Sequence, residues 1–366
     1  MKIAEIIAKL ESIAPAFLQE DYDNAGLITG NPGDECKGIL VSLDATEAVI
    51  QEAIDKKCNL VVAHHPIVFR GLKKINGKHY VERAIIKAIK NDIALFAIHT
   101  NLDNILTGVN GKIADKIGLV NRTILAPKQN LLQKLAVFVP QSHHQILMEA
   151  LFAAGAGGIG EYSECSFSTE GTGTFKAGAG TNPFVGKIGQ RHTENEQKVE
   201  VIFPVWLRNK ILQAMRAAHP YEEIAYDLYN LDNVYQETGS GIIGKLGNPM
   251  EELEFLNHIK KEFNLKLIRH TPLLGKKIEK VAVCGGAGSF LTQAAIASGA
   301  DAYITADVKY HEFFEADNRL LLADIGHYES EQFTIDLLAD VLSEKFPNFA
   351  VLKTGVQTNP VHYFTS

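Results

Sequence analysis

Two adjacent histidines followed by a proline are the first candidate metal ligands. His64, His65 and Pro66 come directly after the apolar run 59–63, which is typical of a buried strand. In open α/β sheets, ligands bind beyond the carboxyl ends of the strands. Pro66 favours an extended backbone at His65, so the two imidazoles should point to opposite sides and hold one ion each. The alternative is a pair of loop histidines hydrogen-bonded to the backbone.

A carboxylate in a similar position is the second candidate. Asp103 lies in the segment 99–104, which follows the apolar run 93–98 and should open on the same rim of the sheet. A carboxylate is a suitable ligand for zinc, manganese or iron. The alternative is an Asx turn or a helix cap. His99 and Asn101 are candidates to orient the ligands through hydrogen bonds.

A histidine and a glutamate at helical spacing form the third candidate. His327 and Glu331 follow the apolar run 320–324 and open a helix, so a spacing of four places them on one helical face. The same geometry serves i, i+4 ligand pairs in metal-binding helices. The alternative reading of Glu331 is a carboxylate that stabilises the start of the helix dipole, but this does not explain His327.

Together these side chains supply three imidazoles and two carboxylates from three loops. Two divalent ions about 3.5–4 Å apart, bridged by a carboxylate and a water, would use all of them. We assign the bridge to Glu331, because it comes from the most rigid element. We expect Zn²⁺, with Mn²⁺ or Fe²⁺ as alternatives. The predicted ligands are His64, His65, Asp103, His327 and Glu331.

Several polar loops near the predicted strand ends could complete the pocket. The glycine-rich segment 285–289 lies between a strand and a helix, where backbone N–H groups can hold an anion. It matches neither a Walker A nor a dinucleotide-binding motif. Lys309 follows another strand and could place a base or a phosphate contact, with a solvated loop residue as the alternative. Asp44, Thr46 and the segment 21–27 are the remaining candidates.

Short apolar runs alternate with helical patterns in both the first and the last third of the chain. This alternation predicts βαβ units, mainly parallel sheets and an α/β fold. The predicted strands are 38–43, 59–63, 93–98, 280–284, 302–305 and 320–324. The predicted helices are 46–57, 80–91, 109–118, 290–299 and 328–345.

The middle of the chain has a different pattern, which suggests a β-α-β-β-α-β module of the ferredoxin-like α+β kind. Its predicted strands are 135–140, 162–167, 172–176, 198–203 and 225–228, and its predicted helices are 142–154 and 205–218. The Gly-rich and polar span 177–196 is predicted to be a loop. We therefore expect a domain inserted at 127–240, within one discontinuous metal-binding α/β core formed by 1–126 and 241–366.

The composition suits a globular protein of about two domains. A net charge of -7, with 22% charged residues, offers no basic footprint for nucleic acid or for an acidic membrane surface, although a local basic patch stays open. The four cysteines are widely spaced and form no CxxC pair, which argues against a disulfide framework and a Cys-type zinc site. We also find no signal-peptide pattern and no membrane span, and we expect a cytoplasmic protein.

Seven ordered segments resemble the Nif-three-like family, whose bacterial members carry the name GTP cyclohydrolase 1 type 2 homologue. They are DYDNAGL, VSLDAT, VVAHHPIVF, HTNLDN, CGGAGSF, DAYITADVKYHEF and DIGHYESE. HPYEEIAYD, at 219–227, also resembles the inserted domain of the longer bacterial members. The resemblance implies a discontinuous α/β core that holds two divalent metals at the five ligand positions above. It also implies a toroidal homohexamer, capped by an insert similar to the trimeric PII and CutA regulators.

Two classes of function stay open. The first is a metal-dependent hydrolase acting on a nucleotide or another phosphorylated small molecule, with His311 or His99 as the proton shuttle. Ring opening of GTP is one version of it. The second is a non-enzymatic metal-binding ring, in which the inserted domain binds an effector. Closed, four-coordinate metal sites would favour the second class. A ring that binds nucleic acid is a third idea, and the net charge weighs against it.

Overall fold

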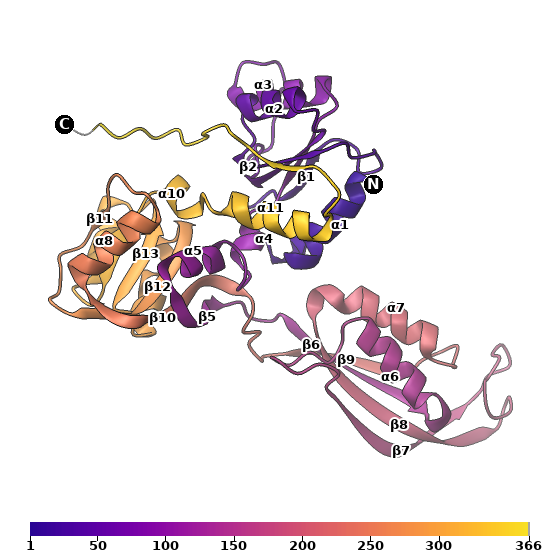
Figure 1. The fold of residues 1–366 in the computed structure, drawn as a ribbon. Coiled ribbons are helices and arrows are strands. Elements are labelled where there is room, and N and C mark those ends of the chain that lie inside the picture. Colours follow the sequence, from indigo (N-terminus) through magenta and orange to yellow (C-terminus); the bar gives the residue numbers. More distant parts are fainter. Residues whose placement is uncertain (365–366) are drawn as a thin grey trace. The chain divides into compact units, whose positions relative to one another are not determined.

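The protein divides into two compact units in the computed structural model, which describes residues 1–364 (Figure 1). Unit 1 comprises residues 1–127 and the chain from Glu237 onward, and unit 2 comprises Lys128–Gln236. Strand β5 (Leu119–Pro127) ends unit 1's first segment, and β10 (Gly239–Glu251) begins its second. These two strands pair antiparallel, so the chain leaves and re-enters unit 1 at neighbouring positions of one sheet.

The first sheet of unit 1 has the strand order β1-β4-β3-β2-β15. Its strands are β1 (Gly26–Thr29), β2 (Ile39–Asp44), β3 (Leu60–His65), β4 (Ala94–Ala97) and β15 (Val351–Lys353). All pairs except β1 with β4 are parallel. The central strands are almost fully buried because helices cover both faces, which is why they read as continuous apolar runs.

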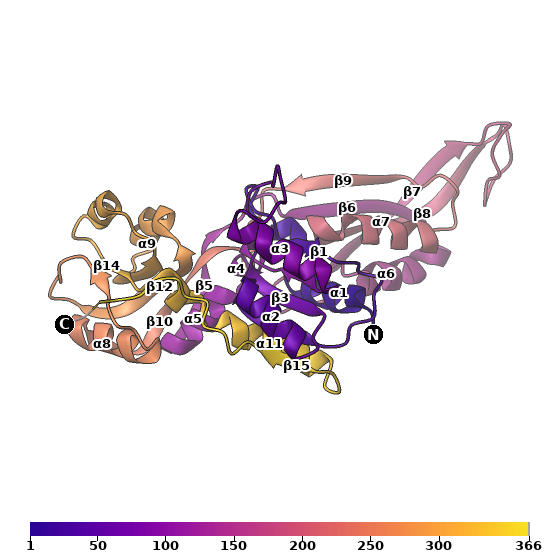
Figure 2. The ribbon, with the colours of Figure 1, turned by 90° about the horizontal axis from the view of Figure 1, so that it is seen from above.

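Four helices cover the first sheet. Helices α2 (Glu47–Asp55) and α3 (Tyr80–Lys90) pack together on one side, away from α1 (Ile3–Ile13) and α11 (Thr334–Lys345) (Figures 1 and 2). Helix α3 turns a buried apolar face to the sheet through residues spaced three and four apart, as in Val81, Ala84, Ile85 and Ala88. The Thr46 side chain caps α2 by accepting a hydrogen bond from the Val49 N–H.

The second sheet of unit 1 has the order β11-β14-β13-β12-β10-β5. Its remaining strands are β11 (Arg269–His270), β12 (Lys277–Ala287), β13 (Ala302–Ala306) and β14 (Leu321–Asp324). Only β12-β13 and β13-β14 are parallel, so the expectation of mainly parallel sheets is wrong here. Helix α8 lies between β10 and β12 in the chain, and unit 2 lies between β5 and β10, so the alternation of strands and helices in the sequence does not reveal this antiparallel pairing.

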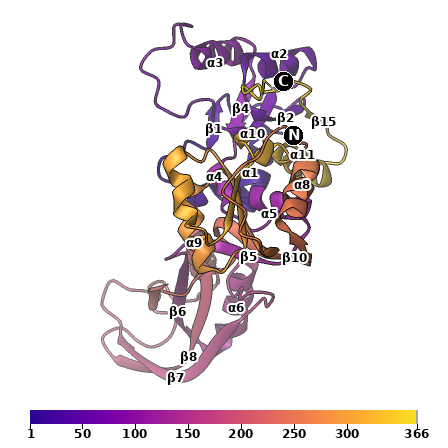
Figure 3. The same ribbon diagram turned by 90° about the vertical axis from the view of Figure 1, so that its left-hand side faces the viewer.

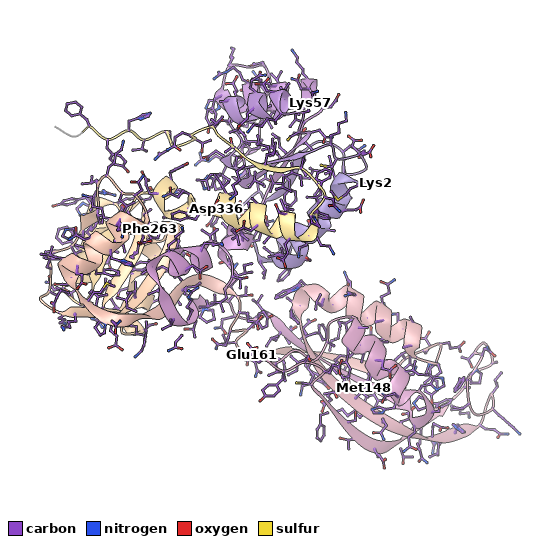
Figure 4. The ribbon with its side chains drawn as sticks, in the orientation of Figure 1. Lys2, Lys57, Met148, Glu161, Phe263 and Asp336 are labelled. Carbon is purple, nitrogen blue, oxygen red and sulfur yellow. The ribbon has the colours of Figure 1, made fainter. Side chains whose placement is uncertain are left out.

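Helices lie on both faces of the second sheet. Helix α9 (Thr292–Ala297) lies on one face, and α5 (Val109–Ile117) and α8 (Glu252–Glu262) lie on the other (Figure 3). Phe263, which follows α8 and is labelled in Figure 4, is buried and packs edge-on against Phe333 at 5.5 Å between ring centroids.

The C-terminal helix differs from its prediction. Two helices, α10 (His327–Glu331) and α11, replace the single helix expected over 328–345. The first of them carries the candidate ligands and presents Glu331 to the interior, where its side chain is buried. Short helices complete unit 1: α4 (Thr100–Asp103), η1 (Ala16–Leu18), η4 (Ser289–Leu291) and η5 (Tyr310–Ala316).

Unit 2 has the element order β-α-β-β-α-β and one antiparallel sheet in the order β7-β8-β6-β9. Its strands are β6 (Leu132–Pro140), β7 (Ser166–Lys176), β8 (Arg191–Pro204) and β9 (Tyr226–Leu231). Its helices are α6 (His144–Ala153) and α7 (Arg208–Ala218), with the short turns η2 (Gln141–His143) and η3 (Val205–Leu207). The two strands expected at 162–167 and 172–176 are one long strand, because Gly171 and Gly173 continue the β7-β8 ladder.

Both helices of unit 2 pack on the same face of its sheet, and their apolar residues form a single core with alternate residues of β6 and β8. Met148 of α6 belongs to this core (Figure 4). Within residues 1–364, no helix has the length and apolar character needed to cross a membrane.

Candidate metal centre

His64 is a buried imidazole with its tautomer fixed. It lies at the end of β3, and its Nδ1 donates a hydrogen bond to the Ile98 carbonyl at 2.8 Å. Because the carbonyl can only accept, the ring proton is on Nδ1 and the Nε2 lone pair is free to accept. Burial lowers the pKa of His64 to about 3, so the ring is neutral at physiological pH.

Asp103, at the end of α4, faces that lone pair. The distance from His64 Nε2 to Asp103 Oδ1 is 3.6 Å, and both atoms are buried without a hydrogen-bond partner. Burial, and then the nearby charge of Glu331, raises the pKa of Asp103. Two buried acceptors that face each other without a donor are unfavourable unless a cation lies between them. This half of the site therefore fits a metal ion.

His65 and His327 form the other half of the cluster around Glu331. His65 Nε2 lies 2.9 Å and His327 Nε2 lies 3.2 Å from the same oxygen, Oε2 of Glu331. The two Nε2 atoms are 3.3 Å apart. A carboxylate hydrogen-bonds the Nδ1 of each ring, on the side away from Glu331. His65 Nδ1 lies 2.8 Å from Asp44, and His327 Nδ1 lies 2.7 Å from Asp307. Carboxylates commonly orient metal-binding histidines in this way.

The protonation of this second half differs from that of His64. Burial by itself lowers the pKa of His65, but hydrogen bonds to Asp44 and Glu331 outweigh it and raise the pKa to about 10. Burial is likewise outweighed at His327, where hydrogen bonds to Asp307 and Glu331 raise the pKa to about 11. Burial would also raise the pKa of Glu331, but bonds to the two imidazoles hold it well below its usual range. In the metal-free protein, the protonated rings of His65 and His327 therefore supply the positive charge beside Glu331 Oε2.

A fourth histidine joins the cluster. His99, in the loop before α4, lies with its ring centroid 5.2 Å from that of His64 and 5.4 Å from that of His65. Its Nδ1 bonds Asp23 at 2.8 Å, and Asp23 also accepts a hydrogen bond from the backbone N–H of Thr100. The candidate ligand atoms of His64, His65 and His99 lie within 4.8 Å of one another, as do those of His65, His327 and Glu331. Either group could hold a metal ion.

The cluster opens into a cavity of about 1300 Å³ in unit 1. Residues from both sheets line the cavity, as does the C-terminal segment 358–363. Six aromatic side chains contribute to its wall: Tyr22, Phe69, Tyr80, Phe290, Tyr328 and Tyr363. The cavity is therefore large enough for a small molecule beside the cluster.

The structure brings together all five predicted ligands and His99, but it does not bring in the other proposed proton shuttle. His311 lies on η5, is exposed, and contacts Tyr310 and Phe314 outside the cavity lining. Lys309 is also largely exposed and pairs with Glu312 at 3.7 Å, which agrees with the solvated alternative. The Asn101 side chain bonds the backbone: its amide donates to the Ala14 carbonyl, and its Oδ1 accepts from the His99 N–H at 3.0 Å.

The glycine-rich segment 285–289 is not an anion-binding helix start. Gly285 and Gly286 belong to β12, and their N–H groups donate to Asn110 and Ser330 side chains. The Gly288 N–H donates to Thr305. Since these donors are used within the protein, the glycines serve close packing instead. A Cβ on Gly286, whose φ is +61°, would lie 2.5 Å from Oε1 of Glu331.

Sequence reasoning missed the carboxylates behind the ligands and the C-terminal contacts. Asp307 was not predicted, and Asp23 was included only as part of the candidate pocket segment 21–27. Asp44 was a candidate only as a pocket residue. Thr358 in the tail donates to Asp44, and Asn359 and Tyr363 donate to Glu329. No local sequence pattern in 356–363 predicts these contacts.

Known proteins of one family are similar to this chain over nearly its whole length. The family model described as Duf34/NIF3 (NGG1p interacting factor 3) matches residues 1–360. A Halalkalibacterium halodurans protein named GTP cyclohydrolase 1 type 2 homolog is 41% identical, over 98% of this chain and 99% of that protein. A Bacillus subtilis protein of the same name is 39% identical, over 97% of each.

Solved structures agree with these sequence relationships. A Bacillus cereus protein described as related to NIF3 superposes with a TM-score of 0.88 at 38% identity, covering 100% of this chain and 99% of that one. Staphylococcus aureus protein SA1388 gives a TM-score of 0.78 at 28% identity, with the same coverage. The mixed α/β architecture described above is therefore shared with these proteins.

Proposed function

This chain belongs to the Duf34/NIF3 family, and on that premise we propose that it is a dinuclear metal-dependent hydrolase of a nucleotide or another phosphorylated small molecule. One observation carries the proposal. The two oxygens of the Glu331 carboxylate face two different sets of side chains, with His64 at 3.9 Å from Oε1 and His65 at 2.9 Å from Oε2. A carboxylate in this position suits a bridge between two cations.

The residues divide between two ions accordingly. His64, Asp103 and Oε1 of Glu331 would hold one ion, and His65, His327 and Oε2 would hold the other. Mixed imidazole and carboxylate ligands favour Zn²⁺, with Mn²⁺ or Fe²⁺ as alternatives. Asp44 and Asp307 would keep the Nδ1 proton of each ring in the second set, so that Nε2 is presented to the ion.

When bound, two divalent ions supply Lewis-acid activation of water for attack on a phosphoester, an amide or a ring carbon. His99 is the residue best placed to accept a proton during such a reaction. Asp23 holds the His99 Nδ1 proton, which leaves Nε2 as the acceptor on the side of the cluster. His311 lies outside the residues that line this cavity, so we assign the role to His99.

The charges around the cavity restrict how a substrate could bind. Among the described residues that line the cavity, Arg269 is the only lysine or arginine, and it pairs with Asp324. The carboxylates that line it are Glu20, Asp44, Asp103, Asp307, Asp324, Glu329 and Glu331. A phosphate group would therefore depend on the metal charge, whereas the aromatic wall would receive a ring. GTP ring opening, which the relatives' name suggests, is one reaction that fits a substrate with its phosphates at the metals and its ring at the aromatic wall.

We further propose the assembly and the insert that the family resemblance implies. Unit 2 would be an inserted ferredoxin-like domain similar to PII and CutA proteins, and its element and sheet order support this. The chain would form a toroidal homohexamer in the cytoplasm, in keeping with its four free cysteines. We propose neither a membrane nor a nucleic acid as a partner.

The competing proposal is a non-enzymatic ring in which the metals are structural or sensed and unit 2 binds an effector. The large cavity in unit 2 favours this alternative. The two proposals differ in whether the metals keep open coordination positions.

Metal analysis combined with turnover assays distinguishes them. Full-length protein loaded with Zn²⁺, Mn²⁺ or Fe²⁺ should contain two ions per chain and hydrolyse at least one member of a nucleotide and phosphoester panel. His65→Ala should abolish turnover and remove an ion, whereas His144→Ala, on α6 of unit 2, should change neither. Two bound ions without turnover would favour the non-enzymatic ring, and one ion per chain would contradict the dinuclear site.

A further inference from the structure

Unit 2 contains a cavity of about 790 Å³ that the metal centre does not involve. It lies on the face of the sheet that α6 and α7 leave open. Strand pairing places Phe138, Lys198, Glu196 and Phe175 on this face, opposite the apolar residues of β6 and β8 that pack under the helices. The loops 177–184 and 221–225 complete its wall.

The floor of the cavity is made by two glycines, and a carboxylate lies over it. Gly171 and Gly173 are two apart on β7, so both leave the same face without side chains. Glu196 of β8 pairs with Gly171 and extends over Gly173, where a Cβ would overlap its Oε2 atom. Burial raises the pKa of Glu196, which is the expected effect on a carboxylate without a neighbouring cation.

Aromatic rings surround this carboxylate. Tyr221 lies between Phe175 and Phe184, at 6.1 Å and 6.3 Å between ring centroids. The Tyr221 hydroxyl is buried beside Glu196, and its pKa is raised by burial, by the charge of Glu196 and by a hydrogen bond to that carboxylate. The half-buried Glu196 carboxylate thus lies among aromatic rings without a cation to balance its charge, and a positively charged ligand would stabilise it.

The charged residues at this cavity indicate the sign of the ligand's charge. Four glutamates line it against two lysines, namely Glu170, Glu196, Glu222 and Glu223 against Lys176 and Lys198. The Lys198 ammonium is itself paired with Glu200 at 3.3 Å. Anionic groups such as phosphate would therefore be repelled. A cation would gain from the carboxylate and from the faces of the aromatic rings, which attract positive charge.

We propose that the open-face cavity of unit 2 is a binding site for a small organic cation, an ammonium or amidinium group on a compact apolar body. The cationic group pairs with Glu196 above the glycine floor, and the body lies between Phe175, Phe184 and Tyr221. The site is independent of the metal centre, so it holds whether or not the protein is a hydrolase.

Three probes of equal ring size but different charge test the proposal by isothermal titration calorimetry on the full-length protein. Benzylammonium should bind at least about ten-fold tighter than benzyl alcohol, and benzoate should not bind. This comparison uses only the unmodified protein, so it does not depend on whether a variant folds. Equal binding of the ammonium and the alcohol would overturn the proposal.

Variants then assign the site. Glu196→Gln keeps the shape and removes the charge, and should reduce benzylammonium affinity by at least about ten-fold, to the level of the alcohol. Glu149→Gln, on the exposed surface of α6, is the matched control and should leave the affinity unchanged. Unchanged binding in a folded Glu196→Gln variant would place the cation elsewhere, for example in the acidic metal cavity, and would refute the assignment.

Discussion

The Thr358 hydroxyl donates a 2.6 Å hydrogen bond to Oδ2 of Asp44, whose other oxygen binds the Nδ1 of His65. The two residues are 314 positions apart in the sequence. This contact connects the C-terminal segment to the ring of a candidate ligand through a single carboxylate. The C-terminal segment 358–363 therefore contributes to the metal centre as well as to the wall of its cavity.

Loss of this contact should weaken metal binding. Asp44→Asn should lower the affinity for Zn²⁺ by about 10–100-fold, because the His65 ring loses the partner that orients it. Thr358→Val should have a smaller effect in the same direction. Competition with a chromophoric chelator measures both. Thr354→Val is the control, since that hydroxyl bonds Glu52 instead, and an equal loss in this variant would mean that the tail acts only through general stability.

Gly286 should be required for the position of Glu331. Its Cβ would lie 2.5 Å from Oε1, so Gly286→Ala should displace the carboxylate and reduce the bound metal from two ions to one or none. Gly275→Ala is a matched control, because Gly275 also has a positive φ, of +68°, but has open space around its Cβ position. Elemental analysis of the two variants after dialysis distinguishes the close contact from backbone strain alone.

Asp103→Asn should act in opposite directions on the metal-free and the metal-loaded protein. In the metal-free protein, an amide N–H can donate to the unpartnered Nε2 of His64, so the free energy of unfolding should be unchanged or rise by about 1 kcal/mol. In the loaded protein, the loss of a charged ligand should remove most of the stabilisation that metal adds. Urea unfolding with and without Zn²⁺ tests both. A large loss of stability in the metal-free variant would contradict the description of this pair.

Metal binding should release protons. The pKa values of about 10 for His65 and about 11 for His327 mean that both rings are protonated near neutral pH without metal. An ion needs the Nε2 lone pairs, so it must displace about two protons from these rings at pH 7, and the raised pKa of Asp103 adds to this count. The affinity should accordingly rise with pH, by about two log units per pH unit below those pKa values. Calorimetry in buffers of different ionisation enthalpy counts the protons, and a count near zero would contradict this prediction.

Much of the centre could be predicted from local sequence. The strand-end positions of His64, His65 and Asp103 follow from apolar runs of strand length, and the i, i+4 spacing of His327 and Glu331 follows from helical geometry. The same runs located most of the strands of the first sheet and the parallel strands of the second. These features depend on neighbouring residues, so periodicity is sufficient to find them.

Other features were decided only by the tertiary structure. His99 and His311 had equal standing as proton shuttles in the sequence, but only His99 lies at the cluster, held there by Asp23. The antiparallel β5 and β10, the contact of Thr358 with Asp44, and the position of Glu196 over Gly173 join residues distant in the chain or on different strands. Local periodicity reports which face of an element is buried. It contains no information on which distant element covers that face, because this depends on packing across the whole unit.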